Sequence, residues 1–357
     1  HFFPKFNQAT GRVAGEVLAG NADDVKRVLD TAQNAYESWS KTPVIMRAEL
    51  LRKTVLLLQS KCDEIAPIVA MESGRSVKDA LGEVSAAVEC GMFFEGEGKR
   101  YYGKTLTSGI ENRFSYLTRQ SIGVGALFTP LNNPLANVAW KVFPALLCGN
   151  TVVLKAHEDT PYVPVWFGKL LKEAGIPAGV YSVIQGKGAE VGELLLIDKR
   201  IKFVSFTGSL ATGQKILHAT ADRLVKVAIE AGGKNPFVVC DDADLEKASQ
   251  LAVMSAFVDA GQRCASASRI IVFDSVYDEF KNLFLERVRN MKIGVSDSDD
   301  MGAVVNERRM NEILKAIDEG KQRGGSIISG GIRLLDKDHK DGFFIAPIFF
   351  LKFLLIA

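Results

Sequence analysis

The chain has 357 residues, 47% of them hydrophobic, so it can bury a large core, and we expect two domains rather than one. Lys and Arg number 44 against 42 Asp and Glu, which gives a formal charge of +2 and no electrostatic case for nucleic acid. The five cysteines have no CxxC spacing, which argues against a disulfide framework and a zinc site. We therefore expect a cytoplasmic protein with small-molecule partners.

Neither end of the chain predicts a targeting segment or a membrane span. His1 is not followed by a basic and then apolar leader, so no signal peptide is predicted. Residues 343–357 are apolar, but Pro347 and Lys352 interrupt them, and a membrane span needs about 20 apolar residues. We interpret this stretch as a core strand that is cut off, and we expect the start of the chain to be truncated as well.

The first hundred residues predict a helical layer. Apolar residues recur at helical spacing from Val25 to Trp39, and Pro43 is placed to start a second helix that runs towards Gln59. A third helix is predicted over 77–97. Residues 106–120 instead predict a two-stranded excursion around Gly109.

From Ile122 the pattern changes to short β-branched runs separated by helical windows, which is typical of parallel strands with crossover helices. The predicted strands are 122–128, 151–154, 180–184, 202–206, 224–229 and 236–240. The predicted helices between them are 135–147, 161–174, 189–196 and 210–219.

A second α/β segment is predicted after Glu230. It contains a helix over 243–260, a strand over 268–273, and helices over 275–291 and 306–323. The fold class is therefore α/β, with a Rossmann-like parallel sheet and a second α/β domain.

Cys264 and Glu230 carry the clearest chemistry, 34 positions apart in Gly261-Gln262-Arg263-Cys264 and Glu230-Ala231-Gly232-Gly233. A thiolate nucleophile and a carboxylate that activates water would oxidise an aldehyde to an acid through a thioester. A lone cysteine is more often a small buried hydrophobe, and a Glu at a strand end is more often a solvated acid. Arg263 could favour the thiolate.

Several other motifs are individually unspecific. Asn132 precedes Asn133 and Pro134, which alone predicts a turn entering a helix. Lys155 and Glu158 follow a predicted strand, where a surface ion pair is the simple alternative. Phe206, Thr207, Gly208 and Ser209 end a strand and open a helix whose N-terminus can face a pyrophosphate. The four histidines form no metal-ligand cluster, so no metal is predicted.

The set as a whole resembles the NAD(P)-dependent aldehyde dehydrogenase superfamily over nearly the whole chain. The resemblance implies that Cys264 is the nucleophile, Glu230 the general base and Asn132 an oxyanion donor. It implies that Lys155 and Glu158 hold the adenosine ribose, so that NAD is favoured over NADP. It also implies a group of cofactor-binding positions: Lys155, Glu158, Gly186, Phe206, Thr207, Gly208, Ser209, Gly213, Ala231 and Gly232.

The resemblance also implies a domain arrangement. Residues 1–105 and 121–231 would form the NAD-binding domain, 106–120 the arm used to form a homo-oligomer, a dimer or tetramer, and 232–357 an incomplete catalytic domain. Leu131 and Asn133 stand where the family has aromatic residues, so the resemblance does not predict the lining of the substrate pocket.

Two rival functions and two interpretations of one helix face are kept as alternatives. One is an inactive fragment that keeps the nucleotide fold, because no Glu-x-Phe-Gly-Pro loop occurs. Another is an enzyme that passes the acyl group to coenzyme A. For the substrate, Asn133, Ala136, Asn137 and Trp140 would share one helix face and favour a short polar aldehyde, or the two Asn residues would simply bond the helix backbone.

Overall fold

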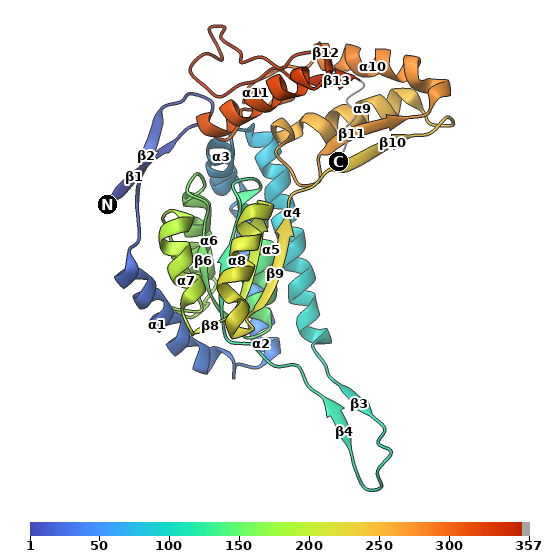
Figure 1. Cartoon of the computed structure of the whole chain (residues 1–357). Coiled ribbons are helices and arrows are strands. Elements are labelled where there is room, and N and C mark those ends of the chain that lie inside the picture. The colour runs from blue at the N-terminus through green and yellow to red at the C-terminus, as the bar shows by residue number, and fades with distance from the viewer. Residues whose placement is uncertain (352–357) are drawn as a thin grey trace. The chain divides into compact units, whose positions relative to one another are not determined.

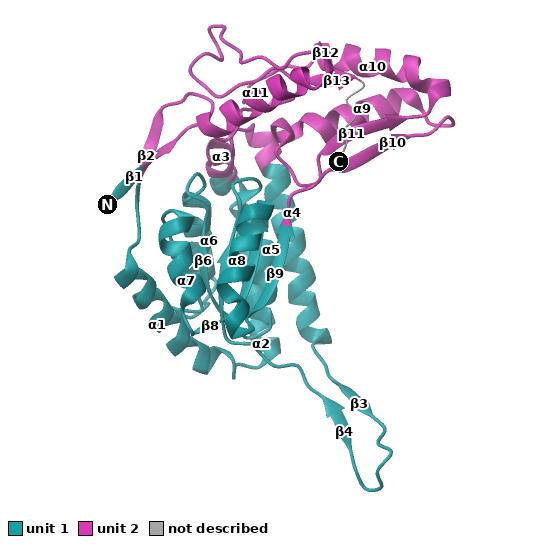
Figure 2. Cartoon of the chain, viewed as in Figure 1, with its two compact units in different colours: residues 1–3, 17–65, 81–230 teal, residues 4–16, 66–80, 231–357 magenta. Residues whose placement is uncertain are grey.

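The computed structural model describes residues 1–351 (Figure 1). Its contacts divide the chain into two compact units, coloured separately in Figure 2. Unit 1 contains residues 1–3, 17–65 and 81–230, and unit 2 contains residues 4–16, 66–80 and 231–357.

Unit 1 is built on a five-stranded sheet with the strand order β7-β6-β5-β8-β9. Its strands are β5 (Val124–Phe128), β6 (Thr151–Lys155), β7 (Tyr181–Ile184), β8 (Ile201–Gly208) and β9 (Lys226–Ala231). β5 pairs in parallel with both β6 and β8, and β6 pairs in parallel with β7. The chain order therefore reverses between β5 and β8, which is the point where doubly wound sheets bind ligands.

Helices cover both faces of this sheet. α2 (Val44–Ser60), α5 (Pro134–Leu147) and α6 (Tyr162–Glu173) contact one another, while α7 (Glu193–Ile197) contacts α8 (Leu210–Thr220). Every residue of β5 and β6 is buried, because the strands are covered on both sides. This explains their continuous apolar sequence.

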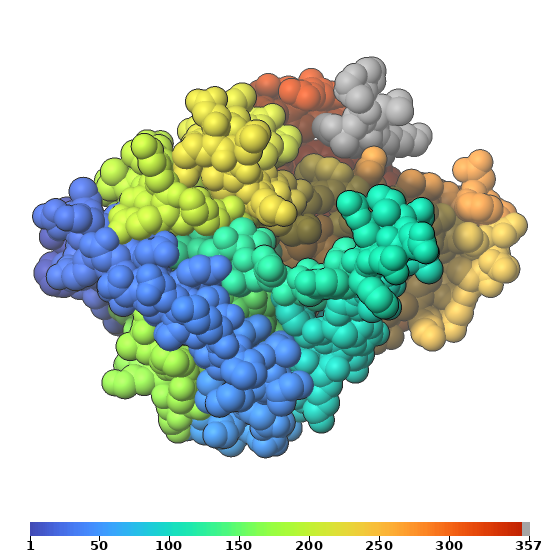
Figure 3. Space-filling model, turned by 90° about the horizontal axis from the view of Figure 1, so that it is seen from below, coloured from blue at the N-terminus to red at the C-terminus, as the bar shows by residue number. Residues whose placement is uncertain are grey.

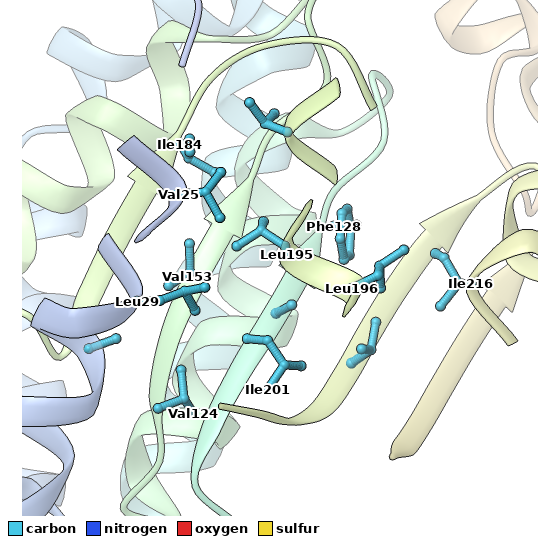
Figure 4. Close-up of a cluster of buried hydrophobic side chains, with 14 of the residues drawn as sticks. Val25, Leu29, Val124, Phe128, Val153, Ile184, Leu195, Leu196, Ile201 and Ile216 are labelled. Atoms are coloured by element: carbon cyan, nitrogen blue, oxygen red, sulfur yellow. The ribbon is translucent and has the colours of Figure 1, made fainter. Parts of the chain in front are cut away.

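A hydrophobic cluster joins the sheet to α1 (Ala22–Trp39), α7 and α8 (Figure 4). α1 begins with a capping box, in which the Asn21 side chain accepts from the Asp24 backbone N–H and the Asp24 carboxylate accepts from the Asn21 N–H. Val25 and Leu29 of α1 point to Val153 and Ile184 of the sheet. α1, the first helix of the predicted layer, therefore covers one face of the five-stranded sheet.

The predicted second and third helices are α2 and α4 (Val77–Glu97), but the prediction lacked α3 (Cys62–Ser73). α3 contains Pro67 in its interior, where a proline usually breaks a helix. At its sixth position Pro67 is tolerated within the described helix.

The excursion at 106–120 is an antiparallel hairpin of β3 (Lys104–Leu106) and β4 (Ser115–Leu117). It extends away from the sheet of its unit in Figure 1, and its teal residues are open to solvent in the view of Figure 3. Phe114 at its tip is 94% exposed. The hairpin therefore contributes almost nothing to the core of unit 1.

Unit 2 contains a parallel pair of strands, β10 (Asn235–Val239) and β11 (Ala267–Val272), with α9 (Leu245–Phe257) and α10 (Tyr277–Arg289) in contact. The predicted strand at 236–240 therefore belongs to this pair and not to the five-stranded sheet. Gly232, with a φ of +42°, lies in the connection between β9 and β10. The aromatic rings of Phe280, Phe284 and other residues form the local core.

The remaining elements of the described chain are short or peripheral. They are β1 (Phe2–Phe6), β2 (Val13–Leu18), α11 (Glu307–Gln322), β12 (Ser326–Ser329), β13 (Phe349–Leu351), 3₁₀ turns at Gly98–Arg100, Ala221–Arg223, Val258–Gly261 and Asp274–Val276, and a π turn at Gly188–Gly192. β13 pairs with β12 and falls within the predicted C-terminal strand, whose last part, 352–357, lies outside the described residues. Among residues 1–351, none of the helices combines the length and the apolar character that a membrane span requires.

Candidate active site

The carboxyl ends of the unit 1 strands bring most of the predicted residues to one edge. Asn132 follows β5, Lys155 ends β6, and Gly186 follows β7. Phe206 to Gly208 end β8, Ser209 follows as the N-cap of α8, and Glu230 is the second-last residue of β9. Because β5 and β8 flank the reversal of strand order, this edge is where an open α/β sheet binds its ligand.

Lys155 and Glu158 form an ion pair in which the lysine is buried and the Glu158 side chain is 39% exposed. Lys155 is only 5% exposed, and its Nζ lies 3.2 Å from Oε2 of Glu158. Burial lowers the pKa of Lys155, although Glu158 opposes this effect. Partial burial would raise the pKa of Glu158, but His157 and Lys155 outweigh it and the pKa is lowered. Glu158 therefore presents a carboxylate beside the end of β6.

The start of α5 is held differently from either sequence interpretation. Asn133 occupies the N-cap position with a φ of +48°, but its side chain makes no cap hydrogen bond. Instead, the buried carboxylate of Glu83 on α4 accepts from the backbone N–H groups of Leu135 (2.6 Å) and Ala136 (2.9 Å). A carboxylate in this position also interacts favourably with the helix dipole.

Asn137 does not line a tunnel as the polar-face interpretation required. It is buried, and its Nδ2 donates to the backbone carbonyls of Asn132 (3.0 Å) and Asn133 (3.1 Å). The alternative, in which the amide bonds the helix backbone, is therefore correct for Asn137. The same bonds fix the backbone of Asn132, which leads into α5.

The turn from β8 into α8 is shaped by glycine. A Cβ on Gly208 would lie 2.5 Å from the Phe206 ring, and one on Gly213 would contact Ile229 at 3.2 Å. Phe206 itself is buried in the hydrophobic cluster, so its side chain is part of the core. Ser209 caps α8 by accepting from the Thr212 N–H at 3.2 Å. The N-terminal N–H groups of α8 point towards the edge where an anion would bind.

The other predicted cofactor positions are backbone positions. Gly186 has a φ of +132°, and a Cβ there would approach Val191 at 3.2 Å. Thr207 is half-buried within β8, and Ala231 is half-buried at the end of β9. Nothing lies within 4 Å of a Cβ built on Gly232.

Glu230 is exposed at the end of β9, and sequence reasoning missed a charged neighbour. Lys141 on α5 is 8% exposed, and its Nζ donates to the Ser205 hydroxyl at 3.1 Å. Burial lowers its pKa to about 8, while the charge of Glu230 opposes the shift. Lys141 also lines a cavity of about 440 Å³ with Trp140 and Cys148. The sequence signal that could have identified Lys141 is a lysine within the otherwise apolar predicted helix 135–147.

Cys264 lies in unit 2, in the loop between α9 and β11. It is exposed, so the interpretation as a small buried hydrophobe is wrong for this thiol. By contrast, burial raises the pKa of Cys90 to about 11. Cys240 is the second exposed thiol among the five.

Side chains that the sequence interpretation did not single out hold the Cys264 loop. Asn235 Nδ2 donates to the carbonyls of Cys264 and Ser266. A Cβ on Gly233 would lie 2.2 Å from the Cys264 carbonyl oxygen, so only glycine fits. Gln262 accepts from the Val305 N–H at 3.0 Å and donates to the Ala303 carbonyl at 3.3 Å. The stretch that follows Glu230 thus supports the nucleophile loop within unit 2.

The expected influence of Arg263 on the thiol is offset by a neighbour. Its Nε lies 3.7 Å from Oδ2 of Asp259, so a carboxylate balances its charge. Within residues 1–351, no group of His, Cys, Asp and Glu side chains is arranged to hold a metal ion.

This fold and edge define a nucleotide-binding α/β protein of the doubly wound class, with an exposed thiol on a loop that backbone contacts hold in place. Comparison with known proteins narrows the class. Residues 1–353 match the aldehyde dehydrogenase family. The chain belongs to this family, and the predicted family, fold class and oxidation of an aldehyde to an acid are confirmed.

Three relatives illustrate the match. The chain is 34% identical to α-ketoglutaric semialdehyde dehydrogenase of Bacillus subtilis, over 95% of the chain and 70% of that protein. It is 32% identical to D-glyceraldehyde dehydrogenase (NADP⁺) of Thermoplasma acidophilum, over 96% and 70%. The structure of betaine aldehyde dehydrogenase from Staphylococcus aureus with NAD⁺ superimposes with a TM-score of 0.95 at 31% identity, covering 98% of this chain and 70% of that one.

Proposed function

We propose that the chain oxidises an aldehyde through a covalent intermediate on Cys264, with Asn132 as an oxyanion donor and Glu230 as the general base. The observation that carries the proposal is the exposed thiol of Cys264 on a loop fixed by Asn235 and Gln262. A nucleophile needs access to substrate and a fixed position, and this thiol has both.

The residues at the sheet edge fit a nicotinamide dinucleotide. Gly208 allows close backbone approach at the N-terminus of α8, and the Lys155–Glu158 pair stands beside the neighbouring strand end. We assign the ribose to Lys155 and Glu158, and the pyrophosphate to the turn from Phe206 to Ser209. Residues 1–105 and 121–231 would form this NAD-binding domain, and 232–357 the catalytic domain.

The chemistry follows from the side chains. The Cys264 thiolate adds to the aldehyde carbon, and the Asn132 amide donates to the developing oxyanion. Bound NAD supplies the hydride acceptor. Glu230 then takes a proton from the water that attacks the resulting thioester, which releases the acid and the free thiol. Exposure of Glu230 at the end of β9 leaves its carboxylate accessible to water.

NAD is the preferred cofactor in this proposal because Glu158 is held as a carboxylate. Lowering its pKa keeps it charged, and a charged carboxylate that bonds the ribose hydroxyls would repel a 2′-phosphate. Relatives at this level of identity use either dinucleotide, since the glyceraldehyde enzyme is named for NADP⁺ and the betaine aldehyde enzyme was solved with NAD⁺.

For the substrate we propose a short, polar aldehyde. The support comes from the relatives, which are named for a semialdehyde and for glyceraldehyde, and not from Asn137, whose amide is buried.

The β3–β4 hairpin is proposed as an arm for a homo-oligomer, because Phe114, Tyr116 and Ile110 expose apolar surface without a partner in their own unit. A reducing, cytoplasmic setting fits five free cysteines.

The test is iodoacetamide labelling of the whole chain, with peptide mapping and assay of NADH formation from succinic semialdehyde or glycolaldehyde. Loss of activity should follow modification of Cys264, whereas modification of Cys240, which is also exposed, should leave activity intact. A Cys240→Ser chain provides the matched control. Activity that survives complete modification of Cys264 would show that the nucleophile is misassigned.

The product of the same assay separates hydrolysis from acyl transfer. Free acid as the product with coenzyme A present supports the role of Glu230 in activating water. A coenzyme A thioester as the main product would instead establish the acylating alternative.

A further inference from the structure

The backbone just before Cys264 adopts an unusual turn. After α9, three successive residues have positive φ: Asp259 (+58°), Ala260 (+54°) and Gly261 (+69°). Glycine adopts this region freely, but each non-glycine residue there costs about 1 kcal/mol. Interactions elsewhere must therefore hold the turn in this shape.

Asp259 is the residue with the interactions to do so. Its side chain is 8% exposed, and Oδ1 lies 3.3 Å from Nε of Arg75, whose side chain is 5% exposed. Its second oxygen, Oδ2, lies 3.7 Å from Nε of Arg263, the residue before Cys264. A carboxylate as buried as this one is stable only when cations compensate its charge. Arg75 and Arg263 are the cations that the described residues provide.

Arg75 is itself fixed to the segment that holds the nucleophile loop. The carbonyl of the preceding Gly74 accepts from the Ala303 N–H at 2.7 Å. Gln262, two residues before Cys264, bonds the same segment through the Ala303 carbonyl and the Val305 N–H. Arg75 and the loop thus share one anchor within unit 2, and Asp259 links them.

We propose that Asp259 is a positioning residue for Cys264, which holds the left-handed turn by binding Arg75 and Arg263 together and keeps the Arg263 charge balanced beside the thiol. This rests on the proposed role of Cys264 as nucleophile. Asp259 touches no reacting atom, so its effect reaches the thiol only through the turn and the two arginines.

The test compares Asp259→Asn with Ala260→Gly in the whole chain. Asparagine keeps the shape and tolerates positive φ, so only the charge is lost, whereas glycine at 260 relaxes the same turn and keeps both ion pairs. The readout is the rate of Cys264 alkylation by iodoacetamide at pH 6 to 10, quantified by peptide mapping, with Cys240 as the internal reference.

In Asp259→Asn, two guanidinium charges lose their counter-ion, which favours the thiolate. The pH at half-maximal alkylation of Cys264 should fall by about half a unit or more, and the reference at Cys240 should not change. Ala260→Gly should keep the wild-type midpoint. An unchanged Cys264 midpoint in Asp259→Asn would overturn the proposal.

If circular dichroism shows that Asp259→Asn is unfolded, Arg75→Met/Asp259→Asn removes both members of the buried pair and serves instead. Arg263 then keeps an unbalanced charge, so the midpoint should still fall, and a wild-type midpoint would again overturn the proposal. Because alkylation needs no turnover, the result is independent of the proposed function. Failure of that function would appear as retained activity after Cys264 is modified.

Discussion

The sheet edge of unit 1 and the cysteine loop of unit 2 are rigid for different physical reasons. At the sheet edge, Lys155 and Phe206 belong to strands whose backbone bonds and burial fix them. In the cysteine loop, Cys264 is exposed, and single side chains such as Gln262 and Asn235 hold the backbone.

This difference shows two ways to fix a functional group. A strand end is fixed by many contacts at once, so the loss of one side chain changes little except the contact with the ligand. A loop held by a few hydrogen bonds depends on each of them. Substitutions in the loop should therefore affect reactivity out of proportion to the effect on stability, and those at the edge should affect ligand preference.

The largest effect is expected for Cys264→Ser. Without the thiolate, NADH formation should fall by about 10³-fold or more, because a serine hydroxyl is a far weaker nucleophile unless a base activates it. The melting temperature should stay near that of the wild type, since the thiol is exposed. The measurement is steady-state NADH absorbance. Cys240→Ser, at the other exposed thiol, is the control and should retain activity.

Glu230→Gln should reduce the steady-state rate by about 10²-fold, since an amide cannot take a proton from water. The burst of NADH in the first turnover should persist, because the carboxylate acts after hydride transfer. Stopped-flow absorbance separates the two phases. Glu49→Gln, on the exposed surface of α2, should behave as the wild type. An unchanged steady-state rate in Glu230→Gln would reject the general-base role.

Gln262→Ala tests the claim about the loop. It removes the side-chain bonds to Asp259, Ala303 and Val305, worth about 1 kcal/mol each, and should lower kcat about 10-fold while the melting temperature falls by only a few degrees. Gln322→Ala at the end of α11 is the control, because it removes the same side chain outside the cysteine loop. If stability falls steeply and kcat per folded molecule is unchanged, the loop is not held in the way described.

Lys141→Met tests the buried amine of unit 1. Its folded pKa of about 8 lies below the ordinary value of 10.5, so burying the charge costs stability in full below pH 8, and this cost disappears as the pH rises towards 10.5. The variant should be more stable than the wild type at pH 7, with the gain shrinking towards pH 10. Urea unfolding at both pH values measures this. A gain that does not change with pH would argue against titration of Lys141.

The smallest effect concerns the cofactor. In Glu158→Gln the repulsion of a 2′-phosphate is lost, and the ratio of NADP to NAD affinity should rise about 5-fold. Titration with each dinucleotide by protein fluorescence gives the ratio. Glu173→Gln, far along α6 in its pair with Lys61, should leave it unchanged. If the wild type binds NADP more tightly than NAD, the assignment of Glu158 to the ribose hydroxyls is wrong.

The sequence pattern predicted the strands of unit 1 well because the buried β5 and β6 are continuous apolar runs between turn residues. It did not predict which sheet residues 236–240 join, because strand pairing is non-local and Gly232-Gly233 carries no periodic signal. It did not include α3, which carries a proline in its interior, a residue that usually breaks a helix.

For the site, the sequence spacing identified Cys264 and Glu230 as candidates. It did not identify the side chains that hold the neighbouring backbone in place. Glu83 caps α5 from a helix 52 positions earlier, and Asn235 reaches the Cys264 carbonyl across 29 positions. Such contacts depend on the tertiary fold, and an isolated Glu or Asn is typical of any surface. The roles assigned to the individual site residues stay predictions until the variants are made.

The β3–β4 hairpin also has a practical consequence for handling the protein. Its strands are three residues long and carry no core, so this segment should open readily and be cut first by proteases, at Arg113 by trypsin and at Phe114 by chymotrypsin. A cut there would leave every strand of the five-stranded sheet intact. The rate of tryptic cleavage after Arg113, followed against protein concentration, therefore reports self-association without any activity assay.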